Sequence, residues 1–184
     1  MDRDGTINEE DGYVHKIEDL RFTPGAQEAI GLARESGYLV VVISNQAGVA
    51  RGYYTEEDVR RFQDHMQDEL KKAGTKVDGF YYCPHHPDSG QGKYLVVCEC
   101  RKPKPGMLIQ ASKDIGIDLS RSFMIGDHLN DIKAGHNAGC RTALVRTGYG
   151  KEQQAKLGEL DFKVDLVTDT LLDAVRAILS RKAG

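Results

Sequence analysis

The start of the chain carries two carboxylates separated by one residue. It reads MDRDGT, with Asp2 and Asp4 in the first four positions. In an extended backbone, side chains at positions i and i+2 project to the same side. One carboxylate can then attack a substrate while the other transfers a proton, as in a catalyst that forms an aspartyl-phosphate. A surface turn or a calcium-binding loop can have the same short sequence, so a catalytic interpretation needs support from elsewhere in the chain.

Three later segments offer the groups that phosphoryl transfer needs. Ser44, Asn45 and Gln46 follow an apolar run, and their hydroxyl and amide groups can hydrogen-bond phosphate oxygens. Lys102 stands in the cationic run RKPKP, just before an expected helix, where anions are favoured. Asp127 follows a short apolar run and could complete a divalent-cation site. Each segment by itself has a simpler explanation: a turn for residues 44–46, a solvated basic linker for RKPKP, and a charge at a helix end for Asp127. Their order along the chain, however, indicates phosphoryl transfer.

A second group of metal-binding residue types lies between positions 83 and 100. Cys83 and His85 are separated by one residue, as are Cys98 and Cys100. Two such pairs are typical of a closed tetrahedral zinc site, so the sequence predicts a structural Zn²⁺ that fastens a loop over residues 83–104. His86 is the alternative to His85, because spacing cannot distinguish adjacent histidines. Scattered thiols beside a surface histidine are the interpretation without a metal.

The composition indicates a chain that folds around one hydrophobic core. Its 184 residues are 40% apolar with a net charge of -3, and we expect a single domain over residues 1–184. Lysine and arginine are spread along the chain, so the expected partner is a small molecule and not nucleic acid. The longest apolar run, residues 39–43, is far shorter than the roughly 20 residues that span a bilayer. Without a signal-like segment, this predicts a cytoplasmic protein with no membrane partner.

Helical patterns alternate with short β-branched runs, which predicts parallel strands joined by crossover helices. A long segment without periodicity, residues 83–104, separates two of these elements and is expected to be functional or held in place by a metal. The predicted helices cover residues 24–36, 55–73, 105–116, 128–137 and 171–180, and the predicted strands cover residues 38–43, 77–82, 122–125 and 142–145.

One strand is missing from this pattern. Open α/β folds bind ligands at the carboxyl ends of parallel strands, so a strand is expected before Asp2. Only Met1 stands there, and the first strand is therefore expected to be truncated. Termini that are not tied down fray, so the position of Asp2 depends on how the rest of the sheet holds it.

The motifs and their order resemble the haloacid dehalogenase (HAD) superfamily over nearly the whole chain. The resemblance implies a three-layer α/β/α sandwich with a mostly parallel sheet and a minimal cap. It implies that Asp2 is the nucleophile and that Asp4 acts first as acid and then as base. It also implies that Mg²⁺ is bound by Asp2, the Asp4 main-chain carbonyl and Asp127, and that Ser44 and Lys102 hold the phosphoryl oxygens.

The runs DGYV, GVARG and CECRKP narrow the resemblance to the branch of heptose bisphosphate and histidinol phosphatases, with the former closer. That branch implies hydrolysis of the C7 phosphate of a heptose 1,7-bisphosphate, for nucleotide-activated heptose and lipopolysaccharide biosynthesis. Arg101 would meet the distal phosphate at C1. Two positions depart from the family pattern, Ser44 in place of threonine and His128 where lysine is frequent. The implied substrate contacts are Glu10, Asp11, Gly12, Tyr13, Ser44, Asn45, Gln46, Ala47, Arg101 and Lys102.

Two alternatives to this function stay open at the level of sequence. A histidinol-phosphate phosphatase would use the same chemistry, but its cationic substrate would gain nothing from Arg101. A catalytically silent, zinc-stabilised binding module would result if Asp2 were displaced. The absence of repeats and of a large cap insertion makes a monomer the simplest expectation.

Overall fold

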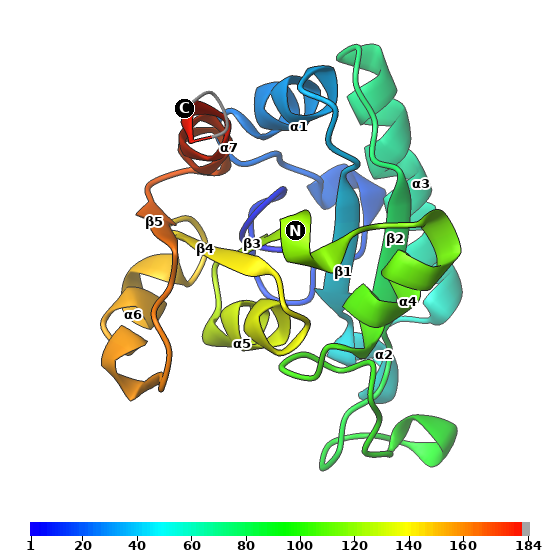
Figure 1. Cartoon of the computed structure of the whole chain (residues 1–184). Coiled ribbons are helices and arrows are strands. Elements are labelled where there is room, and N and C mark those ends of the chain that lie inside the picture. The colour runs from blue at the N-terminus through cyan, green and yellow to red at the C-terminus, as the bar shows by residue number, and fades with distance from the viewer. Residues whose placement is uncertain (182–184) are drawn as a thin grey trace.

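Parallel strands in two groups form the centre of the molecule. The computed structural model describes residues 1–181. The strands are β1 (Val41–Asn45), β2 (Gly79–Cys83), β3 (Phe123–Gly126), β4 (Arg141–Val145) and β5 (Leu166–Thr168). One group has the order β1-β2 and the other the order β3-β4-β5, with every pair parallel (Figure 1).

Met1 and Asp2 lie between the two groups and bond to both. The Met1 nitrogen donates to the Val41 carbonyl at 2.7 Å, and the Met1 carbonyl accepts from the Ile43 N–H at 2.9 Å. The Asp2 N–H donates to the Ile125 carbonyl at 2.8 Å. This alternation is that of a parallel ladder, so two residues occupy the place of a central strand. The first strand is as short as predicted, yet the bonds of Met1 to β1 and of Asp2 to β3 hold this segment on both sides.

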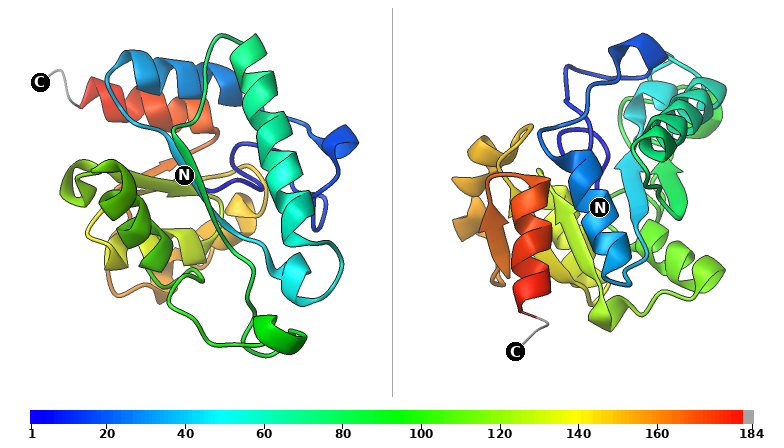
Figure 2. Two further views of the ribbon diagram at one scale, coloured as in Figure 1. Left: turned by 90° about the vertical axis from the view of Figure 1, so that its right-hand side faces the viewer. Right: turned by 90° about the horizontal axis from the view of Figure 1, so that it is seen from above.

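Helices cover both faces of the strands, which confirms the three-layer α/β/α arrangement. Helices α1 (Ala26–Glu35), α3 (Glu56–Lys72) and α7 (Leu171–Ser180) cover one face, and α4 (Gly106–Ile115) and α5 (Leu129–Asn137) cover the other. Figure 2 shows α1 and α7 side by side. Each layer of helices encloses its own apolar core against the strands.

Local sequence explains where several of these helices begin and end. Thr55 and Asp58 form a capping box at the start of α3, with each side chain accepting from the other residue's backbone N–H. Gly37 and Gly116 follow α1 and α4 with φ angles of 85° and 70°, the left-handed conformation that ends helices. These boundaries confirm the helix predictions. No helix within residues 1–181 is both long and apolar enough to cross a membrane.

The predicted strand over residues 38–43 is wrong at its start, because β1 begins at Val41. Pairing with β2 starts only at Val41, opposite Gly79, and the gap between the two strand groups lies on the other side. Val40 still accepts from the Asp78 N–H at 2.7 Å, but the residue-by-residue pairing that defines the strand begins at Val41. Elements too short to show periodicity were also not predicted: β5, α2 (Ala47–Ala50), α6 (Gly150–Gln154) and the 3-10 helices η1 (Ile17–Asp19), η2 (Gly92–Tyr94), η3 (Leu119–Arg121) and η4 (Leu157–Glu159).

Candidate active site

Four charged side chains from distant parts of the sequence meet at the carboxyl ends of the central strands. Asp2 follows Met1, Asp127 follows β3, Asp131 lies in the first turn of α5, and Lys102 precedes α4. All four are buried. One carboxylate oxygen from each of the three aspartates lies within 4.8 Å of the others. The sequence predicted Asp2, Lys102 and Asp127 as members of one site, and the structure brings them together.

The Lys102 ammonium is the centre of this group. Its Nζ lies 2.7 Å from Asp2 Oδ1 and 2.6 Å from Asp131 Oδ1. The same nitrogen donates to the Ile43 carbonyl at 2.9 Å. Asn45 fixes the lysine backbone, because its side chain accepts from the Lys102 N–H at 3.0 Å and donates to the Lys102 carbonyl at 3.1 Å. Burial alone would lower the pKa of Lys102. The charges of Asp131 and Asp2 raise this pKa by more than burial lowers it, so the lysine stays charged.

The three carboxylates carry more negative charge than one lysine neutralises. Burial, followed by the charge of Asp131, raises the pKa of Asp2 to about 7 and that of Asp127 to about 8. A small site that holds clustered carboxylate oxygens with excess negative charge fits a hard divalent cation such as Mg²⁺. The donor set present therefore suits the metal that the sequence implies.

Asp127 is enclosed by backbone that the sequence interpretation did not include. The Tyr149 N–H donates to Asp127 Oδ2 at 2.8 Å. A Cβ atom at either Gly5 or Gly148 would overlap the Asp127 carboxylate, and both glycines have positive φ angles, 75° and 51°. Thr147 Oγ1 donates to the Gly5 carbonyl at 2.6 Å and joins the two loops. The available sequence signal was the run TGYG, which begins two positions after the end of the predicted strand over residues 142–145.

Asp4 lies outside the cluster of three carboxylates and has its own set of donors. Its Oδ1 accepts from Arg3 at 2.8 Å and from Asn8 at 3.0 Å, and its Oδ2 accepts from Gln46 at 2.9 Å. The Arg3 guanidinium is fully buried and lies over the Phe62 ring, 4.5 Å from its centroid. These contacts fix one orientation of the Asp4 carboxylate.

Ser44 and Gln46 are parts of one buried hydrogen-bond network at the end of β1. The Gln46 amide donates to Ser44 Oγ at 2.7 Å as well as to Asp4, and its oxygen accepts from the Tyr54 hydroxyl at 2.8 Å. Gln46, which the sequence places among the substrate contacts, is only 1% exposed. Its contacts here serve to orient Asp4 and Ser44. Ala47, the next predicted contact, begins α2.

The loop that contains Glu10 and Tyr13 lies beside Asp4. Burial and the charge of Asp4 raise the pKa of Glu10, whose carboxylate accepts from the Gly12 N–H at 2.6 Å. Asp11 and Gly12 are exposed. The Tyr13 hydroxyl accepts from Arg51, which follows α2, so this loop meets the loop after β1. Arg51 was not among the predicted site residues.

The predicted zinc ligands form a second cluster, and the structure distinguishes the two histidines. The ligand atoms of Cys83, His85, Cys98 and Cys100 all lie within 4.8 Å of one another. The His86 ring is engaged elsewhere, since its Nδ1 accepts from two backbone N–H groups of the following turn. The hydrogen bond between Cys83 and Cys100 lowers the pKa of Cys100 to about 5 and raises the pKa of Cys83. This cluster favours the thiolate form of Cys100, and a group of thiolate and imidazole ligands is suited to a metal such as Zn²⁺.

The Cys/His cluster is joined directly to the first site. Arg101 and Lys102 follow Cys100 without a gap, and the Arg101 guanidinium donates to the His85 carbonyl at 3.1 Å. In Figure 1 the loop that carries the cluster, drawn in green, projects beyond α2. The conformation of this loop therefore determines where Lys102 enters the carboxylate cluster.

Known proteins resemble this chain over most of its length. Residues 99–174 match the model of a HAD-hydrolase-like family. The chain is 45% identical over 177 residues to the D-glycero-beta-D-manno-heptose-1,7-bisphosphate 7-phosphatase of Haemophilus ducreyi, which covers 95% of this chain and 94% of that protein. It is 46% identical over 145 residues to the D-glycero-alpha-D-manno-heptose-1,7-bisphosphate 7-phosphatase of Burkholderia mallei, with 79% and 77% covered.

Solved structures resemble the fold as well. The D,D-heptose 1,7-bisphosphate phosphatase of B. bronchiseptica, complexed with magnesium and phosphate, superposes with a TM-score of 0.86 at 32% identity. The match covers 98% of this chain and 96% of that one. The corresponding enzyme of Burkholderia thailandensis gives a TM-score of 0.69 at 27% identity, with 97% and 96% covered.

The raised pKa values predict that the metal-free protein loses stability as pH rises. Between the ordinary carboxyl pKa of 3.8 and values of about 7 for Asp2 and about 8 for Asp127, the folded state binds more protons than the unfolded chain. The free energy of unfolding therefore falls with rising pH in that window. Saturating Mg²⁺ should oppose the loss and raise the unfolding temperature by roughly 5 °C at pH 8 but little at pH 5.

Differential scanning fluorimetry measures this effect. An Asp127→Asn variant should lose most of the Mg²⁺-dependent shift at pH 8, whereas Asp68→Asn, on the exposed surface of α3, should keep it. Equal shifts at both pH values would contradict the assignment of the cation to these carboxylates.

The geometry also predicts which histidine binds zinc. His85→Ala should purify with much less than one zinc per chain, because its imidazole lies among the three thiols. His86→Ala, the matched control one residue away, should retain its zinc, because that ring bonds to backbone instead. Elemental analysis of both purified variants gives the answer. Zinc lost from the His86 variant alone would reverse the assignment.

Proposed function

The chain belongs to the family of the D-glycero-D-manno-heptose-1,7-bisphosphate 7-phosphatases, among the HAD-like hydrolases, and we propose that it hydrolyses the C7 phosphate ester of a heptose 1,7-bisphosphate. The products are heptose 1-phosphate and inorganic phosphate, and the first would supply nucleotide-activated heptose for lipopolysaccharide. The observation that carries the proposal is the buried contact between Asp2 and Lys102 beside Asp127. It supplies a nucleophile, a phosphate-binding cation and a cation-binding carboxylate within one small volume.

Asp2 is proposed as the nucleophile and Asp4 as the proton donor and acceptor. An Asp2 oxygen attacks phosphorus, the bond from phosphorus to the C7 oxygen breaks, and Asp4 protonates the departing alkoxide. Asp4 then takes a proton from the water that attacks the aspartyl-phosphate, which releases phosphate and restores Asp2. The contacts from Arg3, Asn8 and Gln46 support this role, because they fix the direction of the Asp4 carboxylate.

Lys102 and Ser44 are proposed to bind the phosphoryl oxygens. Lys102 reaches them from the position in which it now contacts Asp2, and its contacts with Asp131 and the Ile43 carbonyl keep the ammonium in place. A preorganised cation of this kind stabilises charge that develops in the transition state without reorganisation during the reaction. Ser44 Oγ adds a hydroxyl whose orientation Gln46 controls.

Two metals are part of the proposal. Mg²⁺ would be held by Asp2, Asp127 and the Asp4 main-chain carbonyl, and it would offset the repulsion between the nucleophilic carboxylate and the phosphate dianion. Tyr149 orients Asp127 for this purpose through its N–H. Zn²⁺ would occupy the cluster of Cys83, His85, Cys98 and Cys100 with no open position and act only on structure.

The sugar and its second phosphate are proposed to lie toward the Cys/His loop. Arg101 would bind the phosphate at C1, since a guanidinium fork matches the oxygens of a dianion. Its bond to the His85 carbonyl holds it beside this loop. The segments Glu10–Tyr13 and Ser44–Ala47 would line the remainder of the sugar site. The relatives are named for both anomers, so the proposal concerns the ester at C7 and applies to either configuration at C1.

Phosphate release tests the reaction. With Mg²⁺, the chain should release phosphate from the heptose 1,7-bisphosphates and not from histidinol phosphate. Asp2→Asn should lower kcat by roughly 1,000-fold or more, because it removes the nucleophile, while Asp68→Asn should match the unmodified chain. Release from histidinol phosphate alone would select that rival reaction. Substrate binding without release, in a chain with full metal content, would select a silent binding module.

Arg101→Ala tests the distal phosphate site. Loss of a charge-assisted hydrogen bond should lower kcat/KM for the bisphosphate by about 10- to 100-fold and leave that for heptose 7-phosphate nearly unchanged. Lys104→Ala is the control, since its ammonium contacts Glu99 on the protein surface. Zinc content should be measured in parallel because Arg101 also contacts the Cys/His loop. An unchanged preference between the two substrates would remove this role from Arg101.

A further inference from the structure

Arg51 carries a positive charge that no carboxylate neutralises. Within residues 1–181 its guanidinium forms no ion pair, and its Nε is buried without a hydrogen-bond partner. The guanidinium donates instead to a neutral group, the hydroxyl of Tyr13. A cation that is partly withdrawn from water without a counter-charge is costly, so this position favours the binding of an anion.

The backbone of Arg51 is fixed on two sides. Its N–H donates to the Ala47 carbonyl at 3.1 Å at the end of α2. Gly52 follows with a φ angle of 73°, the left-handed conformation that ends helices. From the Cys/His loop, the Gln91 N–H donates to the Ala50 carbonyl at 2.9 Å. The guanidinium therefore extends from a rigid base, which suits a preorganised binding residue.

Tyr13 has an unusual backbone conformation where it meets Arg51. Its φ angle of 58° is the only positive value of a residue other than glycine within residues 1–181. This region is unfavourable for a residue with a large side chain, so contacts must hold it. The ring packs edge-on against Tyr53, with centroids 4.9 Å apart, and its centroid lies 5.4 Å from the Arg51 guanidinium carbon. The Tyr13 hydroxyl thus occupies a donor of Arg51 that a charged acceptor would satisfy better.

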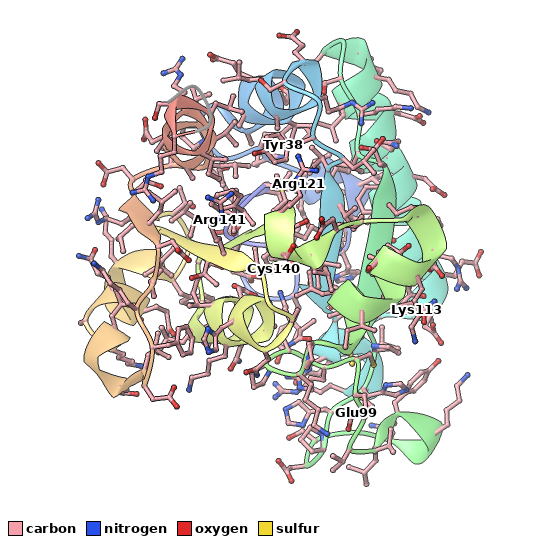
Figure 3. All side chains as sticks on the ribbon, viewed as in Figure 1. Tyr38, Glu99, Lys113, Arg121, Cys140 and Arg141 are labelled. Carbon is pink, nitrogen blue, oxygen red and sulfur yellow. The ribbon has the colours of Figure 1, made fainter. Side chains whose placement is uncertain are left out.

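Arg101, the residue proposed for the distal phosphate, lies in the same region and also lacks a carboxylate partner within residues 1–181. Glu99, two positions before it on the Cys/His loop (Figure 3), pairs with Lys104 at 2.7 Å instead. Burial lowers the pKa of His86, and the charges of Arg101 and Arg51 lower it further, so both guanidiniums lie near this ring. Two guanidiniums without a counter-charge match the charge of a phosphate dianion.

We propose that Arg51 binds the distal phosphate of the substrate together with Arg101, and that it thereby contributes to the selection of a bisphosphate. This inference rests on the proposed function, because it assigns the second phosphate of the same substrate. A phosphate oxygen replaces the Tyr13 hydroxyl as the acceptor of the Arg51 hydrogen bond and neutralises the guanidinium. Arg51 acts on specificity and takes no part in bond breaking, which is assigned to Asp2 and Asp4.

Substitution of Arg51 tests the inference through the preference for a second phosphate. The measured quantity is the ratio of kcat/KM for heptose 1,7-bisphosphate to kcat/KM for heptose 7-phosphate. Arg51→Gln should lower this ratio about 10-fold, mainly through KM, and Arg51→Lys should restore part of it. Arg60→Gln is the matched control, because that guanidinium also contacts a tyrosine hydroxyl but lies on the exposed surface of α3. An unchanged ratio in Arg51→Gln would overturn the inference.

Tyr13→Phe separates direct binding from support of the loop. If Arg51 only held Tyr13 in place, loss of the hydroxyl should lower the ratio as Arg51→Gln does, and that result would also overturn the inference. If Arg51 binds phosphate, Tyr13→Phe should keep the ratio or raise it, because a competing acceptor is removed and any contact of the ring with the sugar affects both substrates alike. Zinc content is measured for each variant, because the Cys/His loop bonds to the residue before Arg51.

Equilibrium binding distinguishes failure of this inference from failure of the proposed function. In the Asp2→Asn background, calorimetric titration with each of the two heptose phosphates gives a ratio of Kd values that does not depend on turnover. Arg51→Gln should reduce this ratio about 10-fold as well. A chain that releases no phosphate yet shows this reduction would contradict the proposed function and support the role of Arg51. A chain that releases phosphate and shows no reduction would do the reverse.

Discussion

The contact of the Lys102 ammonium with two buried carboxylates is the interaction on which the rest of the structure depends. A buried charge without a partner is strongly destabilising, and Lys102 pairs with both Asp2 and Asp131 inside the protein. The three come from the first residues, the end of the Cys/His loop and the first turn of α5. Their contact fixes these segments relative to one another at the carboxyl ends of β1 and β3.

The same contact determines the electrostatics of the site. One ammonium offsets only part of the charge of three clustered carboxylates, and burial makes the remainder costly. The pKa values of Asp2 and Asp127 rise for this reason, and a divalent cation is the natural complement. Gly5 and Gly148 are required at the same place, because any side chain there would occupy the volume of the Asp127 carboxylate.

The Cys/His loop and the gap between the strand groups are two places near the site with little regular secondary structure. The loop positions Arg101 and Lys102 through its ligand cluster and through the bond from Arg101 to His85. At the gap, Asp2 is held by the backbone bonds of Met1 to β1 and of Asp2 to β3, and apolar space adjoins Met1. Both places are connected to Asp2, the proposed nucleophile, by a few hydrogen bonds or ion pairs, so the order of the site depends on structure outside it.

Much of this protein follows from the sequence alone, because the signals are local. The capping box at Thr55, the helix ends at Gly37 and Gly116, and the spacing of the cysteines each express a preference of neighbouring residues. The order of the motifs along the chain, together with the resemblance to the HAD superfamily, predicted that Asp2, Lys102 and Asp127 belong to one site. Only the tertiary structure distinguished His85 from His86, buried Gln46 between Asp4 and Ser44, and enclosed Asp127 with the loop of Tyr149. These are contacts between segments far apart in the chain, and local preference has no influence over which distant partner a side chain meets.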